Sequence, residues 1–404
     1  MSDSNHFFKS IGLADDSGIH PSLVKNAAII LGISPSRLHY YNDNNIVPTG
    51  QDLEVIKKKY NISQEELMLR MGHFNKDLLE AIRTHASDIL KITSLHKTKT
   101  RAAKVKAKIV HKTNLGNLYQ GDCLEMFREV ESDSIDCIFA DPPFNLNKLY
   151  PSKMNDNLKT ESYIEWCHSW LEECSRTLKH GGSLFLWNLP KWNSILTNFL
   201  HGKLTFKHWI TVDIKYSLPI QGRLYPSHYS LLYFVKGDKP NTFKPDRLAM
   251  QTCPHCYGDL KDYGGYKNKM NPLGINLTDV WLDIPPVRHA KYKRRVGSNE
   301  LSIKLLDRII ELSTKEGDIV LDPFGGSGTT YVTAELKKRK WIGCEIGPTE
   351  VIIDRFKLLN EEWEILKTYR KNINNLFPDK IKKERIKREL WTCDCSDQRI
   401  EVAY

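Results

Sequence analysis

The 404-residue chain is long enough for roughly two or three domains, and a hydrophobic content of 40% excludes an intrinsically disordered protein. No apolar run approaches the roughly 18 residues of a membrane span, and the N-terminus lacks a secretory pattern, so we expect a cytoplasmic protein without a membrane partner. The formal net charge of +10, from 59 Lys and Arg against 49 Asp and Glu, favours a polyanionic partner such as nucleic acid, although a generically basic protein would show the same excess.

Residues 1–90 are predicted to form a small helical domain. The stretch NAAIILGISPSRLHYYND at 26–43 predicts two helices separated by a short Gly-Ile-Ser break, and 53–72 predicts a further pair. The turn between the first two helices resembles the helix-turn-helix of phage-repressor-type DNA-binding domains, with an ordinary helical bundle as the alternative. A basic linker is expected at 91–113, because this stretch holds eight Lys or Arg and no acidic residue.

From about residue 114 the pattern changes to alternating strands and helices, which predicts an α/β protein with a doubly wound, mainly parallel sheet. Residues 237–297 interrupt this alternation, since they are basic and rich in Pro, Gly and Tyr. The predicted strands are 117–122, 134–141, 181–190, 207–217, 229–237, 317–322 and 341–345. The predicted helices are 123–130, 162–179, 299–313 and 329–339.

Two of the predicted strands end in residues that suit a binding site. One ends in Asp141-Pro142-Pro143-Phe144, and the other ends in DPF and runs into GGSGTT at 325–330. Ligands of open α/β sheets bind at the carboxyl ends of strands, glycines let a ligand approach the backbone, and a helix N-terminus attracts an anion. Glu345 ends the next strand 20 residues beyond Gly325, the spacing of an acid that binds ribose hydroxyls in dinucleotide folds. A plain helix cap is the alternative for the glycine turn.

The motifs DPPF and DPFGGSGTT together resemble the amino-methyltransferases of DNA, which move a methyl group from S-adenosylmethionine to an exocyclic nitrogen of a base. Their order, with DPPF before the glycines, is similar to the permuted class called beta. The resemblance covers 114–236 and 297–365, about half of the chain, and implies a Rossmann-like methyltransferase sheet. It implies a catalytic half at 114–236, an inserted target-recognition region at 237–297, and a cofactor-binding half with a C-terminal helix at 298–404.

In this resemblance the DPPF tetrapeptide binds the base. The exocyclic nitrogen is a poor nucleophile because its lone pair is delocalised into the ring. The Asp141 carboxylate and the Pro142 carbonyl can accept hydrogen bonds from its two N–H groups, which enriches that lone pair. Pro142 and Pro143 end the strand and stiffen the loop, and Phe144 offers a face on which a flipped base stacks. For Asp-Pro-Pro taken alone, a surface turn is the alternative.

The cofactor residues implied by the resemblance lie at three strand ends. Asp122 would contact the adenine of S-adenosylmethionine, Glu345 its ribose, and Asp322 its cationic amino group. Phe324 and the glycines Gly325, Gly326 and Gly328 would wrap its methionine part. Hydroxyl groups or helix N-terminal amides for its carboxylate would come from Ser327, Thr329 and Thr330. For Ser327 or Thr330, simple capping of the helix is the alternative.

The predicted function is site-specific N6-adenine DNA methylation, because aspartate before the two prolines leans towards adenine in the resemblance. An N4-cytosine enzyme is the alternative, and a DNA-binding regulator with an inactive methylase domain is a less favoured one. Duplex DNA of the nucleoid is the expected partner, and HAKYKRR at 289–295 offers phosphate contacts, with a charged, solvated surface as the alternative. A cognate restriction endonuclease and a second copy of the chain are further candidate partners.

Nine cysteines without framework spacing fit a reducing compartment better than disulfides. Cys253 and Cys256 form one Cys-x-x-Cys pair and are zinc candidates, but a structural zinc needs four ligands. No second pair stands at finger spacing, so an unliganded pair is favoured over zinc. The side chains that could complete a zinc site are His255, His289, Cys393 and Cys395.

Overall fold

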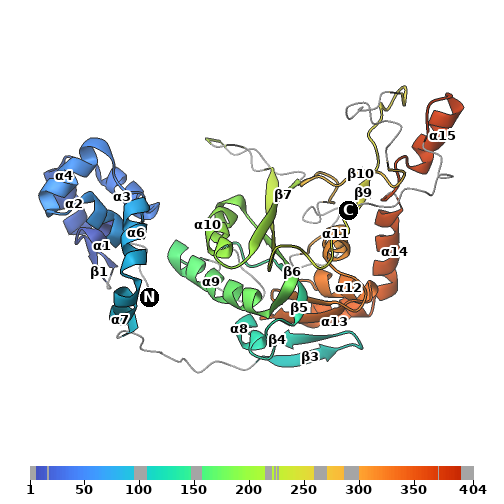
Figure 1. Cartoon of the computed structure of the whole chain (residues 1–404), viewed down its shortest axis with the longest axis horizontal. Coiled ribbons are helices and arrows are strands. Elements are labelled where there is room, and N and C mark those ends of the chain that lie inside the picture. Colours follow the sequence, from blue (N-terminus) through green and yellow to red (C-terminus); the bar gives the residue numbers. More distant parts are fainter. Residues whose placement is uncertain are drawn as a thin grey trace. The chain divides into compact units, whose positions relative to one another are not determined.

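The chain divides into two compact units, one of residues 1–103 together with 157–167, and one of residues 104–156 together with 168–404 (Figure 1). Within the described ranges, no helix is both long enough and apolar enough to cross a lipid bilayer. The structure is a computed structural model that describes residues 6–15, 18–94, 107–146, 157–213, 221–222, 224, 227–258, 271–285, 300–371 and 373–392.

The first unit is a set of short helices around its own hydrophobic core. Phe7, Phe8, Leu38, Ile56 and Leu67 are fully buried in this core. Burial of such side chains stabilises helices that are too short to persist alone in water. Its elements are α1 (His6–Ser10), β1 (Ala14–Asp15), β2 (Gly18–Ile19), α2 (Pro21–Leu31), α3 (Pro35–Asp43), α4 (Gly50–Tyr60), α5 (Gln64–Arg70), α6 (Lys76–Thr84) and α7 (Ala86–Ser94).

Two helix connections of the first unit have the same construction. Gly32 and Asn61 end α2 and α4 in the left-handed conformation, with φ angles of 65° and 49°. Each is followed by a buried isoleucine and then by a serine, Ser34 or Ser63, whose hydroxyl accepts the backbone N–H three residues on, at 3.3 and 3.0 Å. The left-handed residue stops one helix and the serine caps the next. The predicted Gly-Ile-Ser break is the first of these turns, and its role in binding DNA stays a prediction.

The second unit is built on a sheet with the strand order β11-β7-β8-β6-β5-β12-β13-β4-β3. The five strands from β6 to β4 in this order run parallel, whereas β8 is antiparallel to β6 and β7, and β3 is antiparallel to β4. The strands are β3 (Lys108–Lys112), β4 (Gly116–Gln120), β5 (Ile135–Ala140), β6 (Leu178–Asn188), β7 (Thr205–Asp213), β8 (His228–Val235), β11 (Val280–Trp281), β12 (Ile319–Asp322) and β13 (Lys340–Glu345).

Helices cover both faces of this sheet, which confirms the predicted doubly wound α/β fold (Figure 1). The connections β5-α9-β6 and β12-α12-β13 advance in opposite directions along the sheet, so right-handed crossovers place α9 and α12 on opposite faces. Helix α11 packs against α12 and β5. The helices of this unit are α8 (Cys123–Phe127), α9 (Thr160–Thr177, from residue 168 on), α10 (Pro190–His201), α11 (Ile303–Ser313), α12 (Thr329–Leu336), α13 (Glu350–Phe356), α14 (Leu359–Arg370) and α15 (Asp379–Lys387).

The predicted basic linker at 91–113 is wrong at both ends. Helix α7 continues to Ser94, and Lys108–Lys112 form β3, which pairs with β4 at the edge of the sheet. Edge strands tolerate lysine because their outer side faces water, so the charge of this stretch did not exclude a strand. Residues 95–106 lie outside the described residues.

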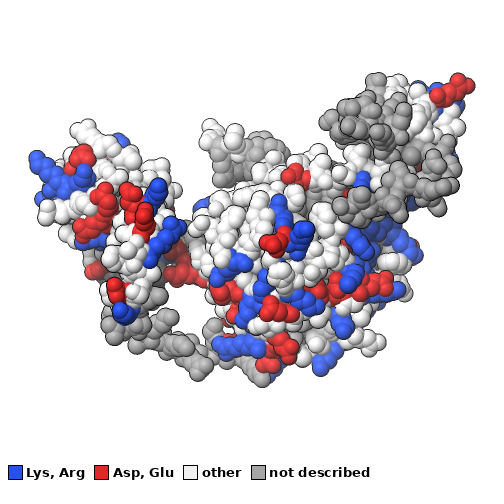
Figure 2. Space-filling view, in the orientation of Figure 1, with Lys and Arg blue, Asp and Glu red and all other residues white. Residues whose placement is uncertain are grey.

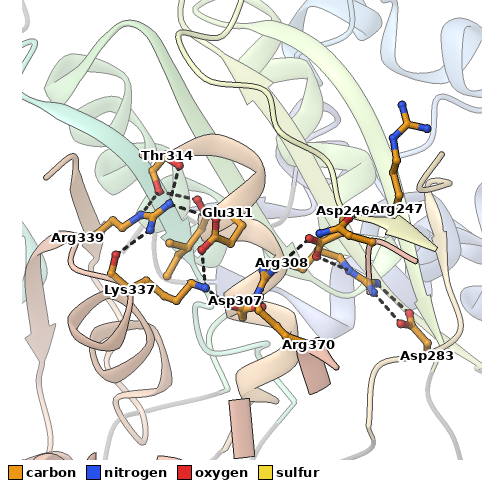
Figure 3. A network of polar contacts seen from close by, with 12 residues as sticks. Asp246, Arg247, Asp283, Asp307, Arg308, Glu311, Thr314, Lys337, Arg339 and Arg370 are labelled. Atoms are coloured by element: carbon orange, nitrogen blue, oxygen red, sulfur yellow. Dashed lines mark hydrogen bonds and ion pairs between the residues drawn. The ribbon is translucent and has the colours of Figure 1, made fainter. Parts of the chain in front are cut away.

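A buried network of charged side chains joins the predicted target-recognition region to α11 and α14 (Figure 3). Arg308 on α11 is 1% exposed and donates to both carboxylate oxygens of Asp283, at 2.9 and 2.7 Å. Arg370 on α14 pairs with Asp246 at 3.3 Å and with Asp307 at 2.7 Å. These pairs fix two described parts of that region against the helices of the sheet.

On the face shown in Figure 2, Lys and Arg side chains are interspersed with Asp and Glu over both units. The basic stretches at 97–106 and 289–295 lie outside the described residues. A continuous basic surface for DNA therefore stays a prediction from the sequence.

Candidate active site

The two strand ends that carry the motifs lie side by side, where the parallel strands of the sheet have their carboxyl ends. Strands β5 and β12 are parallel neighbours, with Cys137 opposite Val320. Strand β5 leads directly into Asp141, and β12 ends at Asp322. The strand order reverses here, because the chain leaves β5 towards β6 and leaves β12 towards β13 on the other side. Such a reversal leaves a crevice at the carboxyl ends of the strands, where ligands of open α/β sheets bind.

Four acidic residues stand at consecutive strand ends. Strands β4, β13, β12 and β5 are neighbours in this order, and they lead into or end at Asp122, Glu345, Asp322 and Asp141. Burial raises the pKa of Asp322 well above its ordinary value, and the negative charge of Asp141 raises it further. An edge that gathers so many carboxyl groups suits a ligand that carries positive charge.

The turn between β12 and α12 requires glycine at two positions. The Gly325 N–H donates to the Cys344 carbonyl at 2.7 Å, and a Cβ on Gly325 would lie 2.9 Å from the Tyr331 hydroxyl oxygen. Gly328 has a φ of 74°, and a Cβ there would lie 2.7 Å from Cγ2 of Ile352. The turn therefore packs closely against β13 and α13. Of its residues from Gly325 to Thr330, Gly326 is exposed and the others are buried.

Asp322 stabilises the glycine turn by accepting two hydrogen bonds. Its Oδ1 accepts the Phe324 N–H at 2.9 Å, and its Oδ2 accepts the Thr330 hydroxyl at 2.5 Å. The Phe324 ring packs edge-on against Trp170 of α9, with 5.0 Å between ring centroids. Both carboxylate oxygens of Asp322 thus have partners within the protein, and its predicted contact with the amino group of a cofactor stays a prediction.

Glu345 and Asp122 are fixed by backbone N–H groups. The Glu345 carboxylate accepts the N–H of Gly326 at 2.8 Å and of Gly347 at 2.6 Å. Burial raises the pKa of Glu345, and these N–H donors oppose the rise. Asp122 caps α8 by accepting the Leu124 N–H at 2.9 Å. Each carboxylate oxygen has two lone pairs, so both residues keep acceptor capacity for a ligand such as a ribose or an adenine.

The DPPF loop is anchored through its aromatic residue. The Phe144 side chain is 5% exposed, and its ring lies 5.9 Å from that of Tyr229 on β8. The Phe144 carbonyl accepts the indole N–H of Trp192 at 2.7 Å. Pro142 is buried, whereas Asp141 is half-buried at the sheet edge. The Phe144 ring belongs to the hydrophobic core, so its predicted stacking on a base stays a prediction.

Arg355 on α13 supports the glycine turn, and no sequence motif pointed to it. It is 2% exposed and donates to the Ser327 carbonyl at 3.2 Å and to the Thr329 hydroxyl at 2.6 Å. Its other nitrogens donate to the Glu362 carboxylate at 3.1 and 3.2 Å, and Glu300 lies 4.0 Å away. Because this contact joins residues 26 or more positions apart, no local pattern could reveal it.

The hydroxyl groups of the turn do not cap α12. Helix α12 has Gly328 as its N-cap residue, without a side-chain cap. Ser327 is 1% exposed and Thr329 is 4% exposed. Capping, the alternative for Ser327 or Thr330, is therefore wrong, because α12 has no side-chain cap. The contact of Ser327, Thr329 and Thr330 with a cofactor carboxylate stays a prediction.

Metal ligands do not gather within the described ranges, where no group of three or more His, Cys, Asp or Glu side chains could hold an ion. Cys137 and Cys344 lie buried in strands, and burial raises the pKa of the Cys137 thiol to about 12. Such thiols are inert core side chains. Cys253 is half-buried and Cys256 is exposed.

Comparison with known proteins places this site in a family. A family model described as DNA methylase, covering N6 and N4 methyltransferases, matches residues 135–353. The chain is 46% identical over 390 residues to the type II methyltransferase M.BamHI of Bacillus amyloliquefaciens, which covers 92% of each protein. It is 32% identical to the DNA adenine methyltransferase YhdJ of Escherichia coli strain K12, over 58% of this chain and 81% of that protein.

Among solved structures, PvuII DNA methyltransferase (cytosine-N4-specific) aligns with a TM-score of 0.44 and 20% identity, over 70% of this chain and 96% of that one. The family model spans more than half of the chain, from the start of β5 into α13, and so includes both the DPPF loop and the glycine turn. The chain belongs to the DNA methylase family of N6 and N4 methyltransferases.

Proposed function

We propose that this protein transfers a methyl group from S-adenosylmethionine to an exocyclic amino nitrogen in duplex DNA, at a specific site. The observation that carries this proposal is the pairing of β5 with β12, which sets the DPPF loop beside the glycine turn. M.BamHI, with which the chain shares 46% identity over nearly its full length, is named a type II methyltransferase.

The residues at the sheet edge fit S-adenosylmethionine. The turn at Gly325 has no room for a side chain, and the carboxylates of Glu345 and Asp122 keep free lone pairs. The acidic edge suits the positive charges of the sulfonium and the amino group. When bound, this cofactor supplies an electrophilic methyl group. Glu345 and Asp122 would hold its ribose and adenine, and the turn would hold its methionine part.

On the other side of the crevice, Asp141 and Pro142 would hold the amino group of the base. The Asp141 carboxylate and the Pro142 carbonyl would accept hydrogen bonds from the two N–H groups of the amino nitrogen. This would turn the nitrogen lone pair towards the methyl group. A nitrogen–carbon bond forms as the sulfur–carbon bond breaks, and the surplus proton leaves the nitrogen for Asp141 or water. Orientation in a dry pocket supplies much of the rate, and the base must leave the helix to reach it.

The favoured acceptor is N6 of adenine, and this choice rests on the aspartate of DPPF alone. The same pair of acceptors suits N4 of cytosine, and the family includes both types. The deciding experiment is methylation of unmodified duplex DNA, followed by nucleoside analysis by mass spectrometry. N6-methyladenine would support the proposal, N4-methylcytosine would replace adenine by cytosine, and no methylated nucleoside would favour a regulator with an inactive methylase domain.

The N-terminal helical unit would help to hold DNA, as its helix-turn-helix resemblance implies. Removing residues 1–90 should then weaken DNA binding more than cofactor binding, which filter binding and calorimetry can measure side by side. A cognate restriction endonuclease and a second copy of the chain remain predicted partners.

A further inference from the structure

The DPPF loop has a second neighbour besides the glycine turn. Strand β6 lies beside β5 on the side away from β12, and Leu186 of β6 stands opposite Ala140, the last residue of β5. Strand β6 ends at Asn188, and the chain passes at once into α10, which begins at Pro190. Because β5 and β6 run parallel, the start of α10 lies at the same end of the sheet as the DPPF loop.

Trp192, in the first turn of α10, contacts the backbone of the DPPF loop. Its side chain is 3% exposed, and its indole N–H donates to the Phe144 carbonyl at 2.7 Å. This distance is at the short end of the range for N–H···O hydrogen bonds, and such a bond is electrostatically stronger in a buried environment than in water. Asn145 follows with a φ of 53°, so the backbone turns directly after the carbonyl that Trp192 holds.

The next residue of α10 holds this donor in place. Asn193 is fully buried, and its side-chain amide donates to the hydroxyl and to the carbonyl of Ser230, at 2.8 and 3.1 Å. Ser230 belongs to β8, which pairs with β6. The first turn of α10 is thereby bound to the sheet, so Trp192 offers its N–H from a position that the sheet determines and the loop does not.

The ring of Phe144 is held by the same strands as its carbonyl. It lies 5.9 Å from the ring of Tyr229 on β8, which lies 4.8 Å from that of Trp187 on β6. The Pro142 carbonyl stands only two residues before the Phe144 carbonyl, and Pro143 between them has a fixed φ angle. Few backbone rotations therefore separate the two carbonyl groups, and fixing one of them restricts the other.

We propose that Trp192 is a positioning residue for methyl transfer, whose indole N–H holds the DPPF loop with the Pro142 carbonyl and the Asp141 carboxylate towards the amino group of the base. This inference rests on the proposed function. Trp192 acts through the backbone of Phe144, and its effect on the rate exceeds what one hydrogen bond contributes to the fold. A displacement of about 1 Å among reacting groups can lower a rate by about a hundredfold.

Removing the indole N–H alone tests this role most directly. The indole of Trp192 can be replaced by benzothiophene through an unnatural amino acid, which keeps the ring shape and puts sulfur in place of the donor. W192F is a second variant without the donor. In both, we expect kcat for methyl transfer to unmodified duplex DNA to fall about tenfold to a hundredfold. The Kd for S-adenosylmethionine, measured by calorimetry, should stay within about twofold of the wild-type value, because Trp192 does not contact the glycine turn.

The matched control is W341F. Trp341 is 1% exposed, and its indole N–H donates to the Glu335 carboxylate at 2.6 Å. It is the second residue of β13, at the end of that strand remote from Glu345. W341F should lower the melting temperature as W192F does, because both lose a buried hydrogen bond and ring volume, but it should keep kcat within about twofold of wild type.

Hydrogen exchange gives a readout that needs neither cofactor nor DNA. Mass spectrometry of peptides that cover the loop should show faster exchange of the backbone N–H groups at 144–146 when the Trp192 donor is removed. In W341F these groups should exchange as they do in the wild type. Such a pattern would show that Trp192 orders the loop before any ligand binds.

Three results would overturn the role of Trp192 in an active wild-type enzyme. The first is a folded benzothiophene variant that keeps the wild-type kcat. The second is a Kd for S-adenosylmethionine that rises by the same factor as kcat falls, and the third is an equal loss of kcat in W341F, since a general loss of packing would then explain the effect. Wild-type protein that transfers no methyl group would instead refute the proposed function, and this role with it.

Discussion

Replacing Arg355 with methionine should lower the free energy of unfolding and also disturb the glycine turn. In the wild type, one buried guanidinium neutralises Glu362 and binds Ser327 and Thr329. Methionine carries no charge, so the variant loses the buried ion pair with Glu362. Removing one partner of a buried ion pair costs about 3–5 kcal/mol, so we expect the free energy of unfolding to fall by about that amount.

Urea unfolding measures this loss, and calorimetry with S-adenosylmethionine measures its effect on the turn. A hydrogen bond to a charged group contributes about 1.5–3 kcal/mol, so loss of the contacts with Ser327 and Thr329 should raise the Kd at least about tenfold. R355K keeps the charge without the planar fork and should fall between wild type and R355M.

The matched control is K357M. Lys357 also pairs with a carboxylate, Asp354 at 2.7 Å, but both side chains are exposed, at 71% and 66%. Surface pairs of this kind contribute about 0–1 kcal/mol. If R355M matched K357M in both unfolding free energy and cofactor affinity, Arg355 would have no role in organising the turn.

The remaining predictions concern the turn, acid stability and DNA binding. G325A places a Cβ 2.9 Å from the Tyr331 hydroxyl, so calorimetry should show weaker cofactor binding and a fold destabilised by about 1–3 kcal/mol; unchanged binding would contradict the close approach. Although burial opposes it, hydrogen bonds and charge from Arg308 lower the pKa of Asp283, so its contribution to stability is present above about pH 4 and is lost as the pH falls below that. Melting curves of D283N should accordingly change less than those of wild type between about pH 5 and pH 3. DNA affinity should fall steeply with added salt, and a flat response would contradict a basic binding surface.

The sequence predicted the parts of the fold that local patterns encode. The apolar runs before Asp141 and Asp322 gave β5 and β12, and the glycines gave the turn into α12. The neighbouring position of these two strand ends followed from the rule that parallel strands present their carboxyl ends at one edge. Strand β3 was missed because its lysine-rich sequence has the composition of a linker, and an edge strand tolerates lysines.

The supporting contacts of the site could not be predicted, because they join distant residues. Arg355 has no local signature, yet it binds a turn more than two dozen positions away. The burial of Phe144 depends on Tyr229, which a different strand supplies.

The central claim is that the loop at Asp141 and the turn at Gly325 serve one reaction from the two sides of a single crevice. The most direct test compares D141A and G325R for cofactor binding by calorimetry and for transfer of radioactive methyl groups to duplex DNA. We predict that D141A binds the cofactor but transfers nothing, and that G325R does neither. Methyl transfer by D141A at the wild-type rate would contradict the claim.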